Sequence, residues 1–561
     1  MALIHRCQFF GLLVLLALSL AGCSRKEVGP SEPAKPQSTR ADQTPVTGDW
    51  VIERIGGDPE TLNPVTGQDA TGAMVNIYIF EGLLVMDNYT LELKPLLAES
   101  YEISPDKLIY TFHLRHDAKF QDGVPITAED VKYSFDKVMD PKVDAASKRS
   151  YFTTIKSCEI LDPYTIRFTA RQPYFKTLEA LGTSDTLPVI PKHILEKGEP
   201  DFNKHPFQRN PVGSGPYKFV RWDTGTQIVL ERDPNYWGGP GHYPDRLIFQ
   251  VIQESYVAAQ LLKKGEIDVV DGMSPIQWER EMEGTRSASR LNKIVYPYPA
   301  YSYLGFNLRK PIFSDVRVRH AIDLLIPRDK ILAQIFLNKY ASPTSGYDPP
   351  SSPNYNHDVA PTTYDPALAL KLLNEAGWKN DHGDGLLYKD GKPLSFGLLY
   401  PAGNANSGKV VELIQEAMAQ AGINLQLERL DGNQLFARAG EWDFDAMMGG
   451  WALDVNGDPS QLWAGSEAKL KKSSNFIGYD NPEANKLIAE GKLEYDPVKR
   501  AAIYRQLQKI IFNDYPCCFL FNPKMILLVS NRFQNVKIFT PRPCFDITTW
   551  WVPKDEQKYG N

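Results

Sequence analysis

A short segment rich in glycine, tryptophan and aspartate is the part of this sequence best suited to contact a ligand. Residues 442–459 (WDFDAMMGGWALDVNGDP) run from apolar residues into a glycine pair, a tryptophan and then carboxylates. Gly449 and Gly450 have no side chains, so another backbone can approach closely there. Trp451 offers a flat apolar wall, and Asp454 offers a fixed negative charge that accepts hydrogen bonds from an ammonium. By residue preference alone, an aspartate such as Asp454 is more often a turn or cap residue than a ligand contact.

Other segments approach known ion-binding or catalytic motifs but lack a required residue. Residues 403–410 (GNANSGKV) have the spacing of a phosphate-binding loop, but Val410 has no hydroxyl to hold Mg²⁺. Residues 380–391 resemble a calcium loop in which Gly391 replaces the required bidentate glutamate. The sequence contains no GxSxG elbow, HExxH motif or paired CxxC motif. We therefore predict no metal site, no cofactor and no catalytic residue, although a triad formed only in space would escape this search.

The N-terminus has the pattern of an export signal. Within residues 1–22, Arg6 precedes an apolar run from Phe9 to Leu20 that is shorter than the ~20 residues of a membrane-spanning helix. The following LAGC sequence resembles the lipobox of bacterial lipoproteins, in which the cysteine, here Cys23, becomes the lipidated first residue. An ordinary secretory signal with a chance cysteine is the alternative. Residues 23–48 are polar and rich in proline, which predicts a flexible linker.

Length and composition limit the class of protein. A chain of 561 residues exceeds the ~250–300 that one hydrophobic core supports, so at least two folding units are expected. The 62 Lys and Arg against 68 Asp and Glu argue against a basic nucleic-acid binder, and six cysteines are too few for a disulfide scaffold. Export would leave four cysteines, which either form one or two disulfides or stay free thiols. They are Cys158, Cys517, Cys518 and Cys544.

The elements that would position the ligand segment alternate between strand and helix. Alternating apolar residues over 108–114 predict a strand with one buried face. Thr127 and Asp365 each stand where a residue that caps a helix N-terminus is expected. A strand, a helix and a second strand are predicted at 394–400, 410–421 and 423–430. Such a βαβ unit has parallel strands, so the sequence predicts an α/β fold.

Several further segments occur together in one order along the chain. They are IGGDPETLNP (55–64), FEGLL (80–84), YTFHLRHDAKFQDGVPITAEDVKYSF (110–135), GSGPY (213–217), NYWGG (235–239), LLKKGEIDVV (261–270), LGFNLRKPIFSDVRVRHAI (304–322), LLNEAGW (372–378) and GWALDVNGDP (450–459). With the lipobox, these segments resemble the solute-binding proteins of bacterial ABC importers, specifically the oligopeptide/dipeptide-binding family, family 5, in its lipoprotein form.

The resemblance implies an α/β fold like that of type II periplasmic binding proteins, with two lobes closing on ligand and an extra inserted domain. Domain I would be discontinuous, with domain II inserted into it and domain III forming the opposite lobe. The implied ranges are 49–88, 216–300 and 522–561 for domain I, 89–215 for domain II and 301–521 for domain III. Ligand that touches both lobes would favour the closed form.

The resemblance also implies a binding protein without enzymatic activity. It would capture peptides outside the membrane and deliver them to a permease driven by cytoplasmic ATPases. We therefore expect an exported monomer, held to a bacterial membrane by lipid on Cys23 and facing the periplasm or the cell exterior.

In peptide-binding members of this family, an extended peptide pairs with strand-like segments on both lobes. Matched to this sequence, those segments are 68–70, with Gln68 and Ala70, and 450–452. The second segment contributes Gly450, Trp451 and Ala452. The family aspartate that pairs with the α-ammonium of the peptide falls on Asp454.

The sequence departs from the family members that grip the carboxylate of short peptides. Those members have an arginine in the loop that here is 401–404, or at the position that here is Met448. A longer peptide, or a ligand without that carboxylate, is therefore favoured over a strict dipeptide or tripeptide. The alternatives are a non-peptide solute on the same scaffold, such as a metal chelate or an oligosaccharide, and a secreted hydrolase.

Overall fold

A computed structural model describes residues 44–67, 69–402, 405–454 and 457–560 of the chain. The predicted signal at 1–22, Cys23, most of the predicted linker and Gln68 lie outside the described residues. Within the described ranges, no helix combines the length and the apolar character needed to cross a membrane.

The main sheet contains twelve strands in the order β18-β17-β19-β13-β20-β11-β1-β10-β9-β8, with β12 and β14 also paired to β20. In chain order the strands are β1 (Trp50–Ile55), β8 (Tyr217–Asp223), β9 (Gln227–Arg232), β10 (Arg246–Val251), β11 (Val269–Val270), β12 (Leu291–Pro297), β13 (Ala300–Phe306), β14 (Ala341–Pro343), β17 (Ser395–Pro401), β18 (Asn424–Leu430), β19 (Ala446–Ala452) and β20 (Cys517–Ser530). The sheet is mixed, because β1 runs parallel to β10 and β17 parallel to β18, whereas β13 runs antiparallel to β19.

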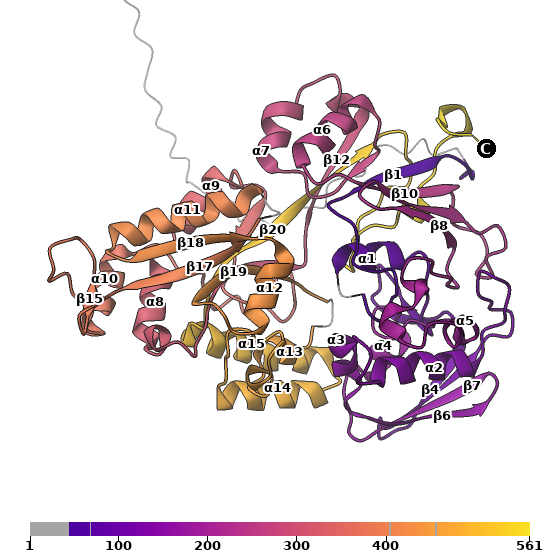
Figure 1. The fold of residues 1–561 in the computed structure, drawn as a ribbon, viewed down its shortest axis with the longest axis horizontal. Helices are drawn as coiled ribbons and strands as arrows, with labels where there is room; N and C mark the ends of the chain where they lie inside the picture. The colour runs from indigo at the N-terminus through magenta and orange to yellow at the C-terminus, as the bar shows by residue number, and fades with distance from the viewer. Residues whose placement is uncertain (1–43, 68, 403–404, 455–456, 561) are drawn as a thin grey trace, which may run out of the picture. The chain divides into compact units, whose positions relative to one another are not determined.

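Strand β20 lies in the middle of this sheet and joins its two halves. Its first residues pair with β13, and its last residues pair with β11 and β12 (Figure 1). The connection between β12 and β13 passes beside it, where the Tyr298 amide donates to the Pro523 carbonyl over 3.3 Å. The Asn522 side chain also donates to the Ala300 carbonyl over 2.6 Å. Two adjacent chain segments therefore connect the β13–β19 part of the sheet with the β1–β10 part.

A separate four-stranded antiparallel sheet has the order β4-β5-β7-β6. Its strands are β4 (Ala98–Ile103), β5 (Ile109–Leu114), β6 (Ile155–Asp162) and β7 (Thr165–Ala170), and two short hairpins are formed by β2 (Leu84–Met86) with β3 (Leu93–Pro95) and by β15 (Tyr388–Lys389) with β16 (Lys392–Pro393). The predicted strand at 108–114 is confirmed as β5, in which the alternate residues Tyr110, Phe112 and Leu114 are buried.

Helices cover both sheets. They are α1 (Ala70–Asn76), α2 (Ala128–Met139), α3 (Ala146–Arg149), α4 (Thr177–Gly182), α5 (Lys192–Leu195), α6 (Ser255–Lys264), α7 (Pro275–Gln277), α8 (Val316–Leu324), α9 (Arg328–Gln334), α10 (Pro366–Glu375), α11 (Ala405–Gln420), α12 (Gly432–Gly440), α13 (Ser460–Trp463), α14 (Pro482–Leu493) and α15 (Pro497–Asp514). Both predicted helix starts are confirmed. The Thr127 amide donates to Asp130 Oδ2 over 3.0 Å before α2, and Asp365 accepts from the Leu368 amide over 2.9 Å before α10.

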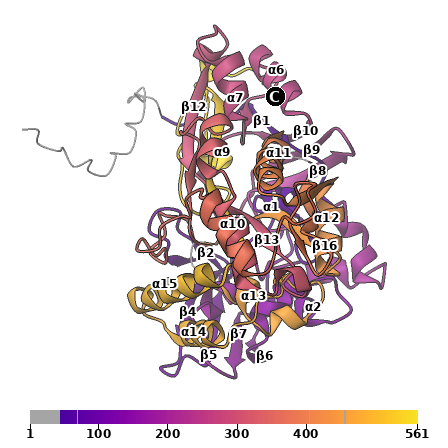
Figure 2. The ribbon, with the colours of Figure 1, turned by 90° about the vertical axis from the view of Figure 1, so that its left-hand side faces the viewer.

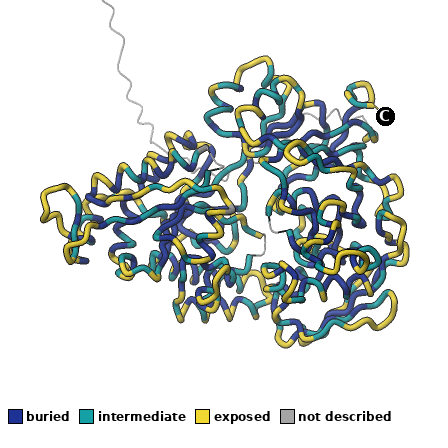
Figure 3. Tube along the Cα trace, viewed as in Figure 1, coloured by how far each residue is buried: buried dark blue, intermediate teal, exposed yellow. Residues whose placement is uncertain are grey.

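The predicted βαβ unit is also confirmed. Strand β17, helix α11 and strand β18 follow one another, and the two strands are parallel from Ser395 opposite Asn424 onward. Figure 2 views this part of the chain from the side of α10, with α9, α10 and α11 in front of the strands. Buried residues follow the strands, and exposed residues gather in loops and on outer helix faces (Figure 3). The α/β prediction is therefore confirmed.

Candidate functional site

Strand β19 is paired along its whole length on one edge only. On that edge it runs antiparallel to β13, from Ala446 opposite Phe306 to Ala452 opposite Ala300. On the other edge, β17 pairs only with Ala446 and Met447. Among the described residues, the edge of β19 from Met448 to Ala452 therefore has no strand partner. Such an edge presents backbone donors and acceptors to which an extended chain can add.

The glycine pair in β19 is explained by its neighbours on β13. A Cβ atom on Gly449 would lie 3.1 Å from the Tyr303 ring, and one on Gly450 would lie 3.1 Å from the Tyr301 carbonyl oxygen. Because Gly449 and Gly450 have no Cβ atom, Tyr303 and the backbone of Tyr301 on β13 can pack closely against β19. Of the predicted binding residues of this strand, Gly450 and Ala452 are exposed to solvent and Trp451 is half-buried.

Trp451 belongs to an aromatic cluster beside the unpaired edge. Its ring stacks on Phe476, with ring centres 5.8 Å apart and 18° between the planes, and lies 6.4 Å from Phe436. Phe436 is 47% exposed. Trp451 also lines a small pocket, together with Tyr301, Tyr303, Leu462, Trp463, Ser474, Phe476 and Ile477. An apolar group on a ligand at the β19 edge would therefore meet aromatic rings.

Asp454 lies just beyond the end of β19 and faces two cations. The amide of the preceding Leu453 donates to the Pro299 carbonyl over 2.7 Å, which fixes the backbone at this point. Lys176 Nζ lies 3.3 Å from Asp454 Oδ2, and Arg542 Nη2 lies 3.2 Å from Asp454 Oδ1. The Asp454 side chain is nevertheless 42% exposed. A charged ligand can therefore reach this carboxylate.

The charges around Asp454 decide its ionisation. Partial burial alone would raise the pKa of the Asp454 carboxyl, but the Lys176 ammonium and the Arg542 guanidinium lower this pKa below its ordinary value. Burial would likewise lower the pKa of Lys176, but the Asp454 and Glu179 carboxylates raise it above its ordinary value. At neutral pH Asp454 is an anion and Lys176 is a cation.

The segment predicted at 68–70 has a different conformation from the one expected. Gln68 lies outside the described residues, and Ala70 is the exposed first residue of helix α1. The Asp69 carboxylate caps this helix, since it accepts from the Gly72 amide over 2.7 Å. The expectation of strand-like backbone through Ala70 is therefore wrong, because an N-cap at Asp69 starts a helix there.

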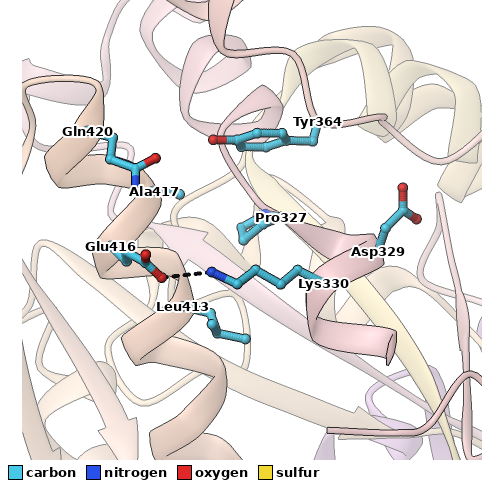
Figure 4. A pocket seen from close by; sticks show the side chains of 8 residues that line it. All are labelled: Pro327, Asp329, Lys330, Tyr364, Leu413, Glu416, Ala417 and Gln420. Atoms are coloured by element: carbon cyan, nitrogen blue, oxygen red, sulfur yellow. Dashed lines mark hydrogen bonds and ion pairs between the residues drawn. The ribbon is translucent and has the colours of Figure 1, made fainter. Parts of the chain in front are cut away.

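A pocket apart from β19 lies between helices α9 and α11. It has a volume of about 380 Å³ and is lined by Pro327, Asp329, Lys330, Tyr364, Leu413, Glu416, Ala417 and Gln420 (Figure 4). An ion pair between Lys330 and Glu416, 2.8 Å long, joins α9 to α11 across it. None of the predicted binding residues lines this pocket, so we do not assign the ligand to it.

The described ranges were also compared with the predicted ion-binding motifs and cysteine pairings. Within them, no three His, Cys, Asp or Glu side chains gather as metal ligands. The calcium-like turn uses Asp384 internally, because its carboxylate accepts from the Tyr388 hydroxyl over 2.6 Å and from the Leu386 amide over 3.0 Å. Of the two alternatives left open for the cysteines, the structure has free thiols at Cys158, Cys517, Cys518 and Cys544.

Lys176 and Arg542 are the site residues that sequence reasoning missed. They are separated from Asp454 by 278 and 88 residues, so no local motif links them to it. The aromatic neighbours of Trp451 were missed for the same reason. The only local sequence signal was the segment that leads to Asp454, and it identified residues on one side of the site only.

Comparison with known proteins gives the family. The family model described as "Bacterial extracellular solute-binding proteins, family 5 Middle" matches residues 92–497. The chain belongs to this family. The two-lobed type II fold that the resemblance implied is therefore confirmed.

Individual relatives are similar over almost the whole chain. The oligopeptide-binding protein AppA of Bacillus subtilis is 29% identical over 98% of both chains. Its structure in complex with a nonapeptide has a TM-score of 0.82 and covers 91% of this chain and all of that one. The binding protein DppA of Helicobacter pylori, in complex with the peptide STSA, is 27% identical, has a TM-score of 0.80 and covers 91% of this chain and 99% of that one.

A relative with a different ligand has a similar fold. NikZ of Campylobacter jejuni, in complex with Ni(L-His), is 25% identical, has a TM-score of 0.78 and covers 90% of this chain and 99% of that one. The shared fold therefore does not by itself select a peptide over a metal chelate, and the residues of the site must decide between them.

Proposed function

We propose that this chain captures peptides outside the membrane and delivers them to the permease and ATPase of an ABC importer. The observation that supports this most is the unpaired edge of β19, with the carboxylate of Asp454 at its end. The backbone of an extended peptide would pair with Met448–Ala452, and its α-ammonium would bind Asp454. Ala70 would contact the peptide from the other lobe at the start of helix α1, and Gln68 would have the same ligand-binding role.

The ligand would be a peptide longer than a tripeptide. The free edge of β19 spans five residues, each of which advances ~3.3 Å in a strand. Met448, which stands where an arginine would grip the carboxylate of a short peptide, is 5% exposed and offers no charge. The resemblance to a protein that binds a nonapeptide supports the same ligand class.

The chain would act as an exported monomer on the outer side of a membrane. Residues 1–22 would be removed, and lipid on Cys23 would anchor the protein through the linker 23–48. Residues 49–88, 216–300 and 522–561 would form domain I, 89–215 the inserted domain II, and 301–521 the opposite lobe. Membership of a family of binding proteins supports a function without catalysis.

The second candidate is a metal chelate, because NikZ holds Ni(L-His) on a similar fold. Native mass spectrometry of the purified protein separates the candidates, since a ligand that leaves on denaturation can be weighed. We expect intact peptides after incubation with a peptide library. Retained nickel complexes would favour the chelate, and shortened peptides would reveal a hydrolase. Retention of neither peptides nor chelates would refute both binding functions.

A further inference from the structure

Three consecutive residues before helix α4, Tyr174–Lys176, each bond to the part of the chain that follows β19. We name them the clasp segment. The Tyr174 hydroxyl donates to Asp458 Oδ2 over 2.7 Å. The Tyr495 hydroxyl accepts from the Tyr174 amide and donates to the Tyr174 carbonyl, both over 3.1 Å. The Tyr495 hydroxyl thus bonds to both the amide and the carbonyl of Tyr174.

The next two residues of the clasp segment add a backbone bond and an ion pair. The Phe175 amide donates to the Lys492 carbonyl over 3.1 Å, and the Arg500 guanidinium lies 4.0 Å from the centre of the Phe175 ring. Lys176 then reaches Asp454. The clasp segment belongs to the proposed domain II, whereas Asp454, Lys492, Tyr495 and Arg500 belong to the proposed opposite lobe. These contacts therefore link the two lobes without any ligand atom.

The surroundings of Lys176 would allow its ammonium to exchange one carboxylate partner for another. Its side chain is only 3% exposed, so its charge needs compensation wherever it lies. Glu179 Oε1, one helical turn along α4, is 3.3 Å from Lys176 Nζ, the same distance as Asp454 Oδ2. The Tyr151 ring lies 5.6 Å from the ammonium as well. Lys176 could therefore give up Asp454 and still face one carboxylate and one aromatic ring.

We propose that the Lys176 ammonium holds Asp454 before a peptide binds, and that the α-ammonium of the peptide takes its place. This inference rests on the proposed function, since it gives the ligand's ammonium the same carboxylate. The clasp segment then links the lobes in the absence of peptide, through Asp454 among other contacts. Each binding event exchanges one primary ammonium for another at the same oxygen, so no unpaired charge is left on Asp454.

The exchange predicts the direction in which loss of the Lys176 charge changes the affinity for peptide. An ion pair that is present before binding and broken by the ligand stabilises the unbound protein, and so weakens the apparent affinity. Removing the Lys176 charge should therefore tighten the binding of peptides with a free amino terminus. A peptide acetylated at its amino terminus has no ammonium to exchange, and its affinity should not improve.

The test compares Lys176→Met and Lys176→Gln with the control Lys192→Met by calorimetry. Lys192 lies in the same proposed domain but pairs with Glu129 over 2.9 Å, away from the other lobe. We expect both Lys176 variants to bind a free-amino nonapeptide at least threefold more tightly than the wild type, and the control to bind it unchanged. The Gln variant keeps a long polar side chain in case Met impairs folding. Unchanged or weaker binding in the folded variants would overturn the inference.

A second measurement separates this inference from the proposed function. If the wild type binds no peptide, the proposed function fails, and the clasp is then tested by small-angle scattering without ligand. A double variant, Lys176→Met with Tyr495→Phe, should have a larger radius of gyration than the wild type, because it lacks the two hydrogen bonds of the Tyr495 hydroxyl and the Lys176–Asp454 ion pair. An equal radius would overturn the clasp.

Discussion

Two charge clusters in this protein have opposite arrangements. At Arg532, one cation lies between the carboxylates of Asp49 and Asp268, and all three side chains are at most 8% exposed. At Asp454, one carboxylate lies between two cations, and it is 42% exposed. The first cluster is sealed from water, whereas the second remains reachable.

The difference in exposure indicates different roles. The Arg532 guanidinium also donates to the Trp50 carbonyl over 2.9 Å, so it ties β1 to the segment after β20. No ligand could replace it without unfolding this region. At Asp454, by contrast, a ligand can compete for the carboxylate, because the contacts are long and partly solvated. A sealed cluster stabilises the fold, and an open cluster can exchange partners.

The largest effect should follow from breaking the sealed cluster. Arg532→Met leaves the buried Asp49 carboxylate without its cation and leaves Asp268 with only Lys558 at 3.8 Å, which should lower the free energy of unfolding by ~3–5 kcal/mol. Chemical denaturation monitored by circular dichroism measures this change. Asp454→Ala should lower the same free energy far less. Equal losses from the two substitutions would refute the distinction between the clusters.

Glu53 is a buried carboxyl that forms no ion pair with the described residues, in contrast to both clusters. Burial, followed by the nearby Asp271 charge, raises the pKa of Glu53 to about 8. Glu53 therefore holds its proton in the folded protein at pH values where the unfolded chain has lost it. This term is fully present below about pH 4.5, the ordinary pKa, and is lost as pH rises toward 8.

Glu53→Gln should remove this pH dependence. Between pH 5 and pH 8, the fall in the free energy of unfolding should be smaller in the variant by about 3 kcal/mol. Urea denaturation at both pH values measures it, with Glu129→Gln as the control, since Glu129 is 63% exposed. Identical pH profiles for Glu53→Gln and the wild type would show that Glu53 is not the source.

The sequence was informative where local chemistry determines structure. Thr127 and Asp365 mark helix starts through bonds to residues only three positions away, and the βαβ unit at β17, α11 and β18 follows from local periodicity. Asp69 is an N-cap too, but family similarity favoured a strand there, and the helix at Ala70 was missed.

The site itself was only half predictable. The ligand segment around Asp454 could be recognised from the run of glycine, tryptophan and aspartate, and the family resemblance implied a strand-like segment at 450–452. The partners of Asp454 could not, because Lys176 and Arg542 reach it through the packing of distant segments. The same limit applies to the free edge of β19, which depends on how far β17 pairs with it.

The central claim is that Asp454 binds the α-ammonium of a peptide. Calorimetry with a free-amino nonapeptide and its acetylated form tests it in the wild type, in Asp454→Ala and in the control Asp443→Ala, whose carboxylate is 71% exposed. We predict that Asp454→Ala weakens binding of the free-amino peptide at least ~30-fold, the factor that corresponds to ~2 kcal/mol, and leaves the acetylated peptide unchanged. Equal affinity of the wild type and Asp454→Ala for the free-amino peptide would contradict the account.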